Sequence, residues 1–440
     1  MILNRSNREN KELITPTLCP IPWNIEYYES DGRKAMCCKA TSYIEGDAEW
    51  NGPQVRQVRK EMLEGKQPKA CTMCFNEEKS AKGLSFRQEW VNMVDQRDPD
   101  FVKNVTTHTD EDGRYNQMPT TQQICLGNKC TNQCNMCSPW NSSAMNKVFK
   151  KIHAGLDMPY DKNWFDPQKY KWVGDDEYWI EKIYPKLHHT KALIITGGEP
   201  LIVKRFEQIL EYCADNGLSK NMELHFNTNT AQIPTPYVYE LIKSFKNVLI
   251  LTSIDDIEKR NEYIRYPTTW EQTQRFIEWG EATADHINLN IFATIQIMNI
   301  YHLTDIQDYW FNQNITKFNK NLGGFIMTNP CHLPEKFSSR ILPTKLKQKV
   351  RRKFDNWKQN LNQNYLDSNT GEDPIITENR MWAFERLEHF ITNMENDNTL
   401  SPHLNRSNEE FYDDFTRWTI MQDKIRGTDY TKVFPWLTMS

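Results

Sequence analysis

The sequence lacks any long uninterrupted apolar segment. Its most apolar long stretch, residues 287–303, contains Asn, Thr, Gln and His side chains, and residues 1–15 are polar and charged. A helix that crosses a bilayer needs about 20 mostly apolar residues, and a secretory signal needs an apolar core. The sequence therefore predicts a cytoplasmic protein with neither a membrane segment nor an export signal.

The sequence also lacks an excess of charge of either sign. It has 54 Lys and Arg against 58 Asp and Glu in 440 residues, which argues against a protein that binds nucleic acid through bulk electrostatic attraction. It shows no internal repeats and no low-complexity tract. Its length predicts two or three domains and is sufficient for a full hydrophobic core.

Cysteine, by contrast, is plentiful, with 11 residues. In a chain without an export signal, an odd number of closely spaced cysteines indicates metal or cluster ligands rather than disulfides. Cys130, Cys134 and Cys137 have Cx3Cx2C spacing, so one short loop can direct three thiolates to one centre. A cubane iron–sulfur cluster usually takes four cysteines. The loop therefore predicts a [4Fe-4S] cluster with one iron open to a non-protein ligand.

Two other interpretations of this loop are a zinc knuckle and three unrelated core cysteines. Zinc sites usually combine a CxxC pair with a second pair or with histidines, and no histidine lies within fifteen residues of Cys134. Chance clustering at this spacing is a poor explanation when only 11 of 440 residues are cysteine. The cluster interpretation is therefore preferred.

Together with the strand-like residues 121–128 before it, the loop resembles the signature of the radical S-adenosylmethionine (SAM) enzymes. Family members often have an aromatic residue just before the third cysteine, where this chain has Met136. The resemblance implies that SAM chelates the open iron and that one electron cleaves it to methionine and a 5′-deoxyadenosyl radical, which takes hydrogen from a substrate. It also implies an electron donor such as a flavodoxin or ferredoxin.

From residue 121 onward, strand-like and helix-like stretches alternate. Strands are predicted at residues 121–128, 191–198, 222–229, 247–255, 287–299 and 323–329, and helices at 205–214, 236–245, 270–282 and 303–312. Six β/α units predict an α/β fold with a parallel sheet and helices outside it, and they match the partial (β/α)6 barrel of radical SAM enzymes. The barrel is assigned to residues 120–332, and residues 333–440 to a helical C-terminal extension that caps it.

Chemistry in barrels of this type takes place at the carboxyl ends of the strands, where this chain has several polar motifs. The resemblance implies SAM contacts: the amino group at Gly197, Gly198, Glu199 and Pro200, the ribose at Asn227 and Asn229, the carboxylate at Arg265, and further contacts at Ser253 and Asp255. Gln296 is a further candidate, because it lies at the end of the fifth predicted strand, within reach of the cofactor. The family more often has glycine at the positions of Thr230 and Asp256. From the residues alone, the first motif can also be a simple turn, Arg265 a surface arginine and Gln296 a core amide.

The N-terminal 110 residues carry a second group of cysteines. Cys19 and Cys37 flank a predicted hairpin at residues 24–28 and 33–38, and Cys71 and Cys74 follow a predicted helix at 54–64. Four such thiols can form one site for zinc, as in zinc ribbons, or for a second [4Fe-4S] cluster. Cys38 is the alternative to Cys37, because adjacent residues on a strand point to opposite faces.

The spacing from Cys19 through Gly32 to Cys37 resembles the opening of the twitch domain, a shortened SPASM domain that carries an auxiliary cluster in radical SAM enzymes. Here it precedes the barrel, an order that also occurs in phage-encoded members of the superfamily. The resemblance favours iron–sulfur over zinc. A linker is predicted within residues 91–119, with a loop at 108–113, so the auxiliary domain is assigned to residues 1–110.

These patterns predict a radical SAM enzyme that acts on a peptide or protein, because twitch-type relatives often modify peptides. The alternatives are a radical SAM enzyme for a small molecule or nucleotide, and a non-enzymatic, zinc-stabilised binding protein on an inactive barrel. Metal content separates these readings, since about seven or eight irons per chain indicate two clusters, whereas zinc in both sites indicates the binding protein.

Overall fold

The computed structural model describes most of the chain. The described residues are 15–40, 48–80, 85–97, 100–156, 162–313, 315, 317, 326–364, 374–395 and 405–438. Residues 1–14 of the predicted auxiliary domain and residues 323–325 of the last predicted strand lie outside these ranges.

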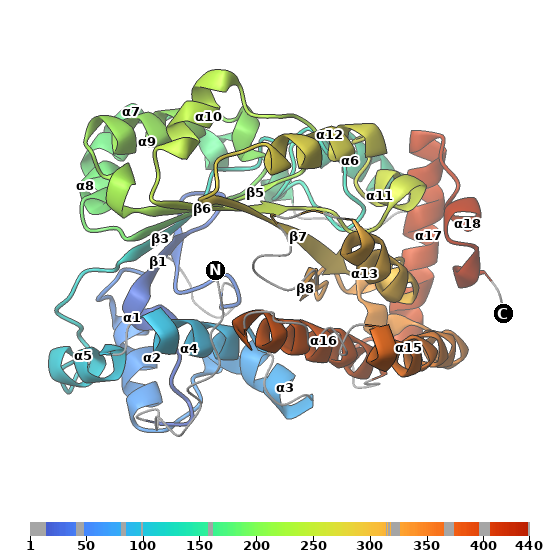
Figure 1. Cartoon of the computed structure of the whole chain (residues 1–440), viewed down its shortest axis with the longest axis horizontal. Helices are drawn as coiled ribbons and strands as arrows, with labels where there is room; N and C mark the ends of the chain where they lie inside the picture. Colours follow the sequence, from blue (N-terminus) through green and yellow to red (C-terminus); the bar gives the residue numbers. More distant parts are fainter. Residues whose placement is uncertain are drawn as a thin grey trace.

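The described residues form a mixed α/β fold around one curved sheet (Figure 1). Its strands follow the order β2-β1-β3-β4-β5-β6-β7-β8, and β3 to β8 are parallel to their neighbours. The strands are β1 (Ile25–Tyr28), β2 (Lys34–Ala35), β3 (Thr121–Cys125), β4 (Ala192–Thr196), β5 (Glu223–Thr228), β6 (Asn247–Thr252), β7 (Ile287–Ile295) and β8 (Met327–Pro330). The predicted α/β class is therefore confirmed, and each of the six predicted strand stretches overlaps a strand.

Helices precede, cover and follow this sheet. The N-terminal helices are α1 (Ile21–Asn24), α2 (Pro53–Leu63), α3 (Thr72–Ser80), α4 (Phe86–Arg97) and α5 (Phe101–His108). Those between or after the parallel strands are α6 (Met145–Leu156), α7 (Asp176–Tyr178), α8 (Tyr184–Leu187), α9 (Lys204–Asp215), α10 (Pro236–Lys243), α11 (Glu258–Ile264), α12 (Trp270–Glu281) and α13 (Leu303–Asn312). The C-terminal helices are α15 (Thr344–Asn364), α16 (Pro374–Glu395), α17 (Asn408–Arg426) and α18 (Tyr430–Val433).

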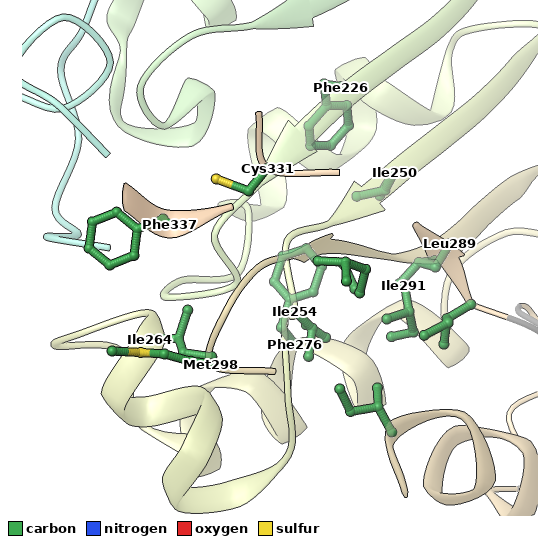
Figure 2. Packing of buried hydrophobic residues seen from close by; sticks show 14 of the residues in the cluster. Phe226, Ile250, Ile254, Ile264, Phe276, Leu289, Ile291, Met298, Cys331 and Phe337 are labelled. Atoms are coloured by element: carbon green, nitrogen blue, oxygen red, sulfur yellow. The ribbon is translucent and has the colours of Figure 1, made fainter. Parts of the chain in front are cut away.

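The main core lies between the sheet and the helices on its convex side. Helix α9 buries Phe206, Ile209, Leu210 and Cys213, the face predicted from their helical spacing. Helix α12 starts at a capping box in which Thr269 and Gln272 bond each other's backbone. Figure 2 shows the packing around β5, β6 and β7, with labelled side chains at Phe226, Ile250, Ile254, Ile264, Phe276, Leu289, Ile291, Met298, Cys331 and Phe337.

The N-terminal hairpin belongs to the same sheet. Strand β1 pairs in parallel with β3, and β2 pairs antiparallel with β1. The return strand ends at Ala35, earlier than the predicted residue 38, so Cys37 and Cys38 lie in the turn that follows rather than on a strand. Strand alternation therefore does not decide how these two cysteines point.

The predicted linker within residues 91–119 contains the end of α4 and all of α5. Phe101 and Val105, one turn apart on α5, are buried in a second apolar cluster with Trp90 of α4. Charged residues dominate the segment, but this apolar spacing is sufficient to fold it onto the N-terminal unit.

Helices from both ends of the chain cover the concave side of the sheet. In Figure 1, α4 and α16 lie across this side, and an ion pair between Glu89 of α4 and Arg386 of α16 joins them. Arg386 also donates to the Thr328 carbonyl of β8 at 2.6 Å. In the described residues, no helix has the length and apolar character needed to span a membrane.

Candidate active site

The three-cysteine loop follows β3 and is held by the segment after α11. The Asn135 N–H donates to the Ile264 carbonyl at 3.1 Å, and the Gln133 N–H donates to the Tyr266 carbonyl at 2.6 Å. The Asn132 side chain donates to the Arg265 carbonyl at 2.9 Å. Hydrogen bonds therefore fix the backbone between the cysteines, which is otherwise irregular.

The C-terminal extension also holds this loop. Arg426, at the end of α17, donates to the Asn135 side-chain oxygen at 2.6 Å and to the Gln133 carbonyl. The amide nitrogen of Asn135 lies 3.2 Å from the Met298 sulfur. Sequence reasoning missed Asn132, Asn135 and Arg426, because nothing in the local pattern indicates a contact between residues 291 positions apart.

The thiols of the loop differ in acidity. A hydrogen bond from Cys137 and the charge of Arg265 lower the pKa of Cys134 to about 6, against the opposing effect of burial. Burial raises the pKa of Cys130 to about 11. The shared hydrogen bond, together with burial, raises the pKa of Cys137. Cys134 is thus the thiol of the loop that loses its proton most easily, and metals bind the thiolate form.

Arg265 supplies the buried positive charge of the site. Its Nε and Nη2 atoms lie 2.6 and 2.7 Å from the two carboxylate oxygens of Asp255, and its Nη1 lies 3.7 Å from the Cys134 sulfur. The Thr294 N–H donates to the same carboxylate at 2.8 Å. Arg265 is therefore no surface arginine. Its guanidinium already contacts Asp255, so a SAM carboxylate would have to bind the guanidinium together with Asp255.

Gly197 and Gly198 let the turn after β4 cross the base of the cysteine loop. A Cβ at Gly198 would lie 2.1 Å from the Lys129 carbonyl oxygen, and one at Gly197, whose φ is +109°, would lie 2.7 Å from the Leu126 nitrogen. The Glu199 N–H donates to the Lys129 carbonyl at 2.8 Å. The glycines thus serve contact between two protein segments, and they bring Glu199 next to the loop.

Glu199 connects the ends of β4 and β5. Its carboxylate accepts hydrogen bonds from the Asn229 N–H at 2.6 Å, the Thr228 hydroxyl at 3.0 Å and the Leu201 N–H at 3.2 Å, just after Pro200. Burial raises its pKa to about 7 despite these donors. The Asn229 amide nitrogen in turn lies 3.2 Å from the Thr131 hydroxyl and 3.7 Å from the Cys130 sulfur.

The remaining predicted cofactor residues lie around this centre. The Ser253 N–H donates to the Thr228 carbonyl at 2.8 Å, and Asn227 lines the cavity described below. Gln296 is fully buried, and neither polar atom of its side chain has a hydrogen-bond partner among the described residues. Buried amides are normally satisfied, so this one fits contact with a bound ligand. Thr230, at the usual glycine position, adopts a left-handed φ of 62°.

A cavity of about 1140 Å³ fills the concave side of the sheet. This exceeds the roughly 300–1,000 Å³ of ordinary ligand pockets. It reaches the cysteine loop and both ends of the strands. Its lining includes Met136, Cys137, Thr196, Asn227, Thr294 and Asn329 at the carboxyl ends, Thr121, Ala192 and Glu223 at the amino ends, and Phe86, Trp90 and Phe101 on the helical side.

The N-terminal cysteines gather at a separate, small pocket. Cys19, Cys37, Cys71 and Cys74 all line it, whereas Cys38 lines the large cavity. Burial, reinforced by the neighbouring thiols, raises the pKa of Cys19 and Cys37. Such thiols stay protonated until a cation displaces the proton.

Arg87 stands beside this pocket. Its guanidinium lies 2.6 Å from a Glu78 oxygen and donates to the Leu18 carbonyl at 2.7 Å. Four thiols that line one pocket are a donor set that suits zinc and iron–sulfur alike. As the described side chains are placed, no three Cys, His, Asp or Glu residues are close enough together to hold a metal ion, so a bound metal would have to draw the thiols together.

Comparison with known proteins yields only distant likeness. No protein-family model and no curated protein matches the chain. Among solved structures, Streptococcus suis SuiB matches with 13% identity over 73% of this chain and 64% of that chain, at a TM-score of 0.32. SuiB bound to S-adenosylmethionine matches with 13% identity over 73% of this chain and 65% of that chain, at a TM-score of 0.34. SuiB bound to precursor peptide SuiA matches with 15% identity over 70% of this chain and 63% of that chain, at a TM-score of 0.32. Each match spans less than two thirds of the SuiB chain, and scores near 0.3 leave the function to be argued from the site itself.

Proposed function

We propose that the protein is a radical SAM enzyme whose catalytic [4Fe-4S] cluster is held by Cys130, Cys134 and Cys137. When bound, the cluster and SAM supply an electron and then a 5′-deoxyadenosyl radical that takes a hydrogen atom from the substrate. Three thiols from one loop are the donor set for a cluster with one open iron.

One observation carries the proposal: the carboxyl ends of β3 to β6 bring three elements into contact, and the first of them lines the large cavity through Met136 and Cys137. The three elements are the cysteine loop, the Glu199–Asn229 pair and the Asp255–Arg265 pair. Ligand sites of parallel α/β folds lie at this edge. A metal-binding loop that served only stability would not need a cavity of about 1140 Å³ beside it.

The residues around the loop have distinct proposed roles. Glu199 orients the SAM amino group, and Gly197 and Gly198 allow the close contact with the cysteine loop that brings Glu199 there. Arg265 stabilises the thiolate of Cys134 and attracts the SAM carboxylate. Gln296, whose side chain has no partner among the described residues, completes its hydrogen bonds on the cofactor. The polar ends of Asn227, Asn229 and Ser253 face the ribose.

The N-terminal site of Cys19, Cys37, Cys71 and Cys74 is proposed to hold an auxiliary [4Fe-4S] cluster, as in twitch or SPASM domains. A structural zinc is the competing occupant. Because Cys38 lines the substrate cavity and not the four-cysteine pocket, Cys37 is the proposed ligand.

The proposed substrate is a peptide or protein. The cavity extends along the sheet from Ala192 to Thr196 of β4 and from Glu223 to Asn227 of β5. Five residues of a strand span about 17 Å at roughly 3.3 Å per residue, which is enough for a short extended segment of peptide beside SAM. Polar side chains on the sheet face an aromatic wall from α4 and α5, a combination that suits both backbone and side chains of a peptide. A flavodoxin or ferredoxin is the proposed electron donor, in the cytoplasm.

The test is reductive SAM cleavage. Protein purified without oxygen should contain about seven or eight irons and should form 5′-deoxyadenosine from SAM after reduction with dithionite. The Cys130→Ala/Cys134→Ala/Cys137→Ala variant should lose this activity and keep the N-terminal metal, whereas Cys213→Ala, a buried cysteine of α9, is the matched control. Wild-type rates in the triple variant, or zinc in both sites of the wild type, would overturn the proposal.

A further inference from the structure

Glu77 and His332 form a short contact between distant parts of the chain. Glu77 lies on α3, and His332 follows β8. The His332 Nε2 atom lies 2.6 Å from a Glu77 carboxylate oxygen, across 255 positions of sequence. Both side chains are largely buried, with 20% and 13% of the His332 and Glu77 side chains exposed.

The surroundings keep Glu77 ionised. Burial raises its pKa, but the hydrogen bond and charge of His332 and the charges of Lys39 and His389 outweigh burial, so that the pKa of Glu77 lies below its ordinary value. A carboxylate bonded to one nitrogen of an imidazole fixes the ring's orientation and stabilises its protonated form.

The second ring nitrogen of His332 is available to a ligand. Glu77 is the one hydrogen-bond partner of the ring among the described residues, and that bond engages Nε2. His332 lines the large cavity, as do Cys137 and Asn329 at the carboxyl ends of the strands. The pair is therefore at the end of the cavity where the proposed chemistry starts.

Helix α3 links this pair to the N-terminal cysteines. Cys74 lines the four-cysteine pocket, and Glu77 is three positions further along the same helix. Residues three apart share a helix face. The N-terminal unit thus sets the position of a carboxylate that acts at the cavity of the barrel.

We propose that His332 is an acid–base residue for the substrate and that Glu77 is its positioning residue. This rests on the proposed function. His332 takes a proton from a substrate X–H group through Nδ1: the X–H bond breaks, an N–H bond forms on the ring, and the electron pair stays on the substrate. The Glu77 carboxylate stabilises the imidazolium and holds Nδ1 toward the cavity.

The pair Glu89–Arg386 also joins an N-terminal helix to the C-terminal region, and both of its residues line the large cavity as His332 does. The Arg386 guanidinium contacts Glu89 and donates to the Thr328 carbonyl, and a guanidinium does not give up its proton in proteins. An imidazole can gain and lose a proton near neutral pH, so His332 is the acid–base candidate of these two contacts.

The test uses diethyl pyrocarbonate, a small reagent that acylates neutral imidazole nitrogens, on the metal-loaded protein under anaerobic conditions. His332 should be modified, and peptide mass spectrometry locates the label. His189, which is exposed, is the positive control, and the buried His389 is the negative control. Modification of His189 without His332 would overturn the proposal, because the ring would then not be presented to the cavity.

The role of Glu77 is read from rescue in the same reaction. Without the carboxylate, the ring loses the contact that fixes its orientation, so Glu77→Leu should slow the labelling of His332 several-fold relative to that of His189, and Glu77→Asp should restore the wild-type rate. Equal labelling rates in the wild type and Glu77→Leu would refute the positioning role. The labelling needs neither SAM nor substrate, so its failure is distinct from absent 5′-deoxyadenosine formation in the wild type.

Discussion

Arg265 contacts both carboxylate oxygens of Asp255, through Nε at 2.6 Å and Nη2 at 2.7 Å, while its Nη1 atom lies 3.7 Å from the Cys134 sulfur. A planar guanidinium can make both contacts at once, and a lysine ammonium cannot. One side chain thereby ties the ends of β6 and α11 to the cysteine loop and sets the charge at that loop.

Replacing Arg265 should lower both the stability of the fold and the iron content of the cysteine loop. Arg265→Gln leaves Asp255 buried without its partner, which should cost about 3–5 kcal/mol in the free energy of unfolding. It should also raise the pKa of Cys134 and lower the iron content of the loop. Urea denaturation of the metal-free protein and iron analysis measure the two outcomes.

The double variant Arg265→Gln/Asp255→Asn is the matched control, because it removes both charges together. We expect it to recover part of the lost stability and none of the lost iron retention. Full iron content in either variant would show that Arg265 has no influence on the loop.

Gly198→Ala should disturb the cysteine loop through packing alone. The added Cβ would lie 2.1 Å from the Lys129 carbonyl oxygen, which is backbone and cannot rotate away. Such overpacking costs about 1–3 kcal/mol or more, and here it pushes on the segment that leads into Cys130. Thermal unfolding and iron analysis should show both losses. Gly174→Ala, where no atom lies within 4 Å of the new Cβ, should show neither.

Cys37 and Cys38 should differ sharply in metal binding. Cys37→Ser should lose the N-terminal metal, because Cys37 lines the pocket shared with Cys19, Cys71 and Cys74. Cys38→Ser should keep it. The Cys71→Ala/Cys74→Ala variant should lose the same metal and become sensitive to protease in its first 90 residues, as metal-dependent small domains do. Metal loss in Cys38→Ser with retention in Cys37→Ser would reverse the ligand assignment.

Asp256 should make the metal-free protein less stable as the pH rises. Burial raises its pKa from 3.8 to about 7, although the Arg260 guanidinium opposes this. A raised pKa favours folding while the group is protonated, so this contribution is complete below pH 3.8 and is lost as the pH rises through 7. At 1.36 kcal/mol per pKa unit, the loss is on the order of 4 kcal/mol.

Asp256→Asn keeps the oxygen that accepts from the Ile257 N–H and stays neutral. Its advantage in unfolding free energy over the wild type should therefore grow between pH 5 and pH 8. Denaturant titrations at several pH values measure this, with Asp215→Asn on the exposed side of α9 as control. A constant difference across this range would place the titrating carboxyl elsewhere.

Local sequence patterns predicted the elements well and the contacts between them poorly. The helical spacing of Phe206, Ile209 and Leu210 and the apolar run of β4 are local, so their elements could be predicted to within a few residues. The close spacing of Cys130, Cys134 and Cys137 likewise fixes them in one loop.

Contacts across long sequence separations left no such signal. Arg426 is an ordinary basic residue at a helix end, and only the packing of α17 on α6 and the strand-end loops places it at Asn135. Glu77 and His332 are likewise brought together only by the packing of distant parts of the chain, because 255 positions separate them. The role of Gly198 was also unpredictable, because a glycine pattern alone does not tell whether a ligand or another protein segment approaches it.

The place of β1 between β2 and β3 has a consequence for how this architecture could arise or be rearranged. An N-terminal cysteine unit joined only by a tether could be exchanged between proteins as a cassette. Here its removal would strip a paired neighbour from β3 and leave that edge open to aggregation. Chimeras that import this unit must therefore carry the receiving strand with it, and the two parts should change together in evolution.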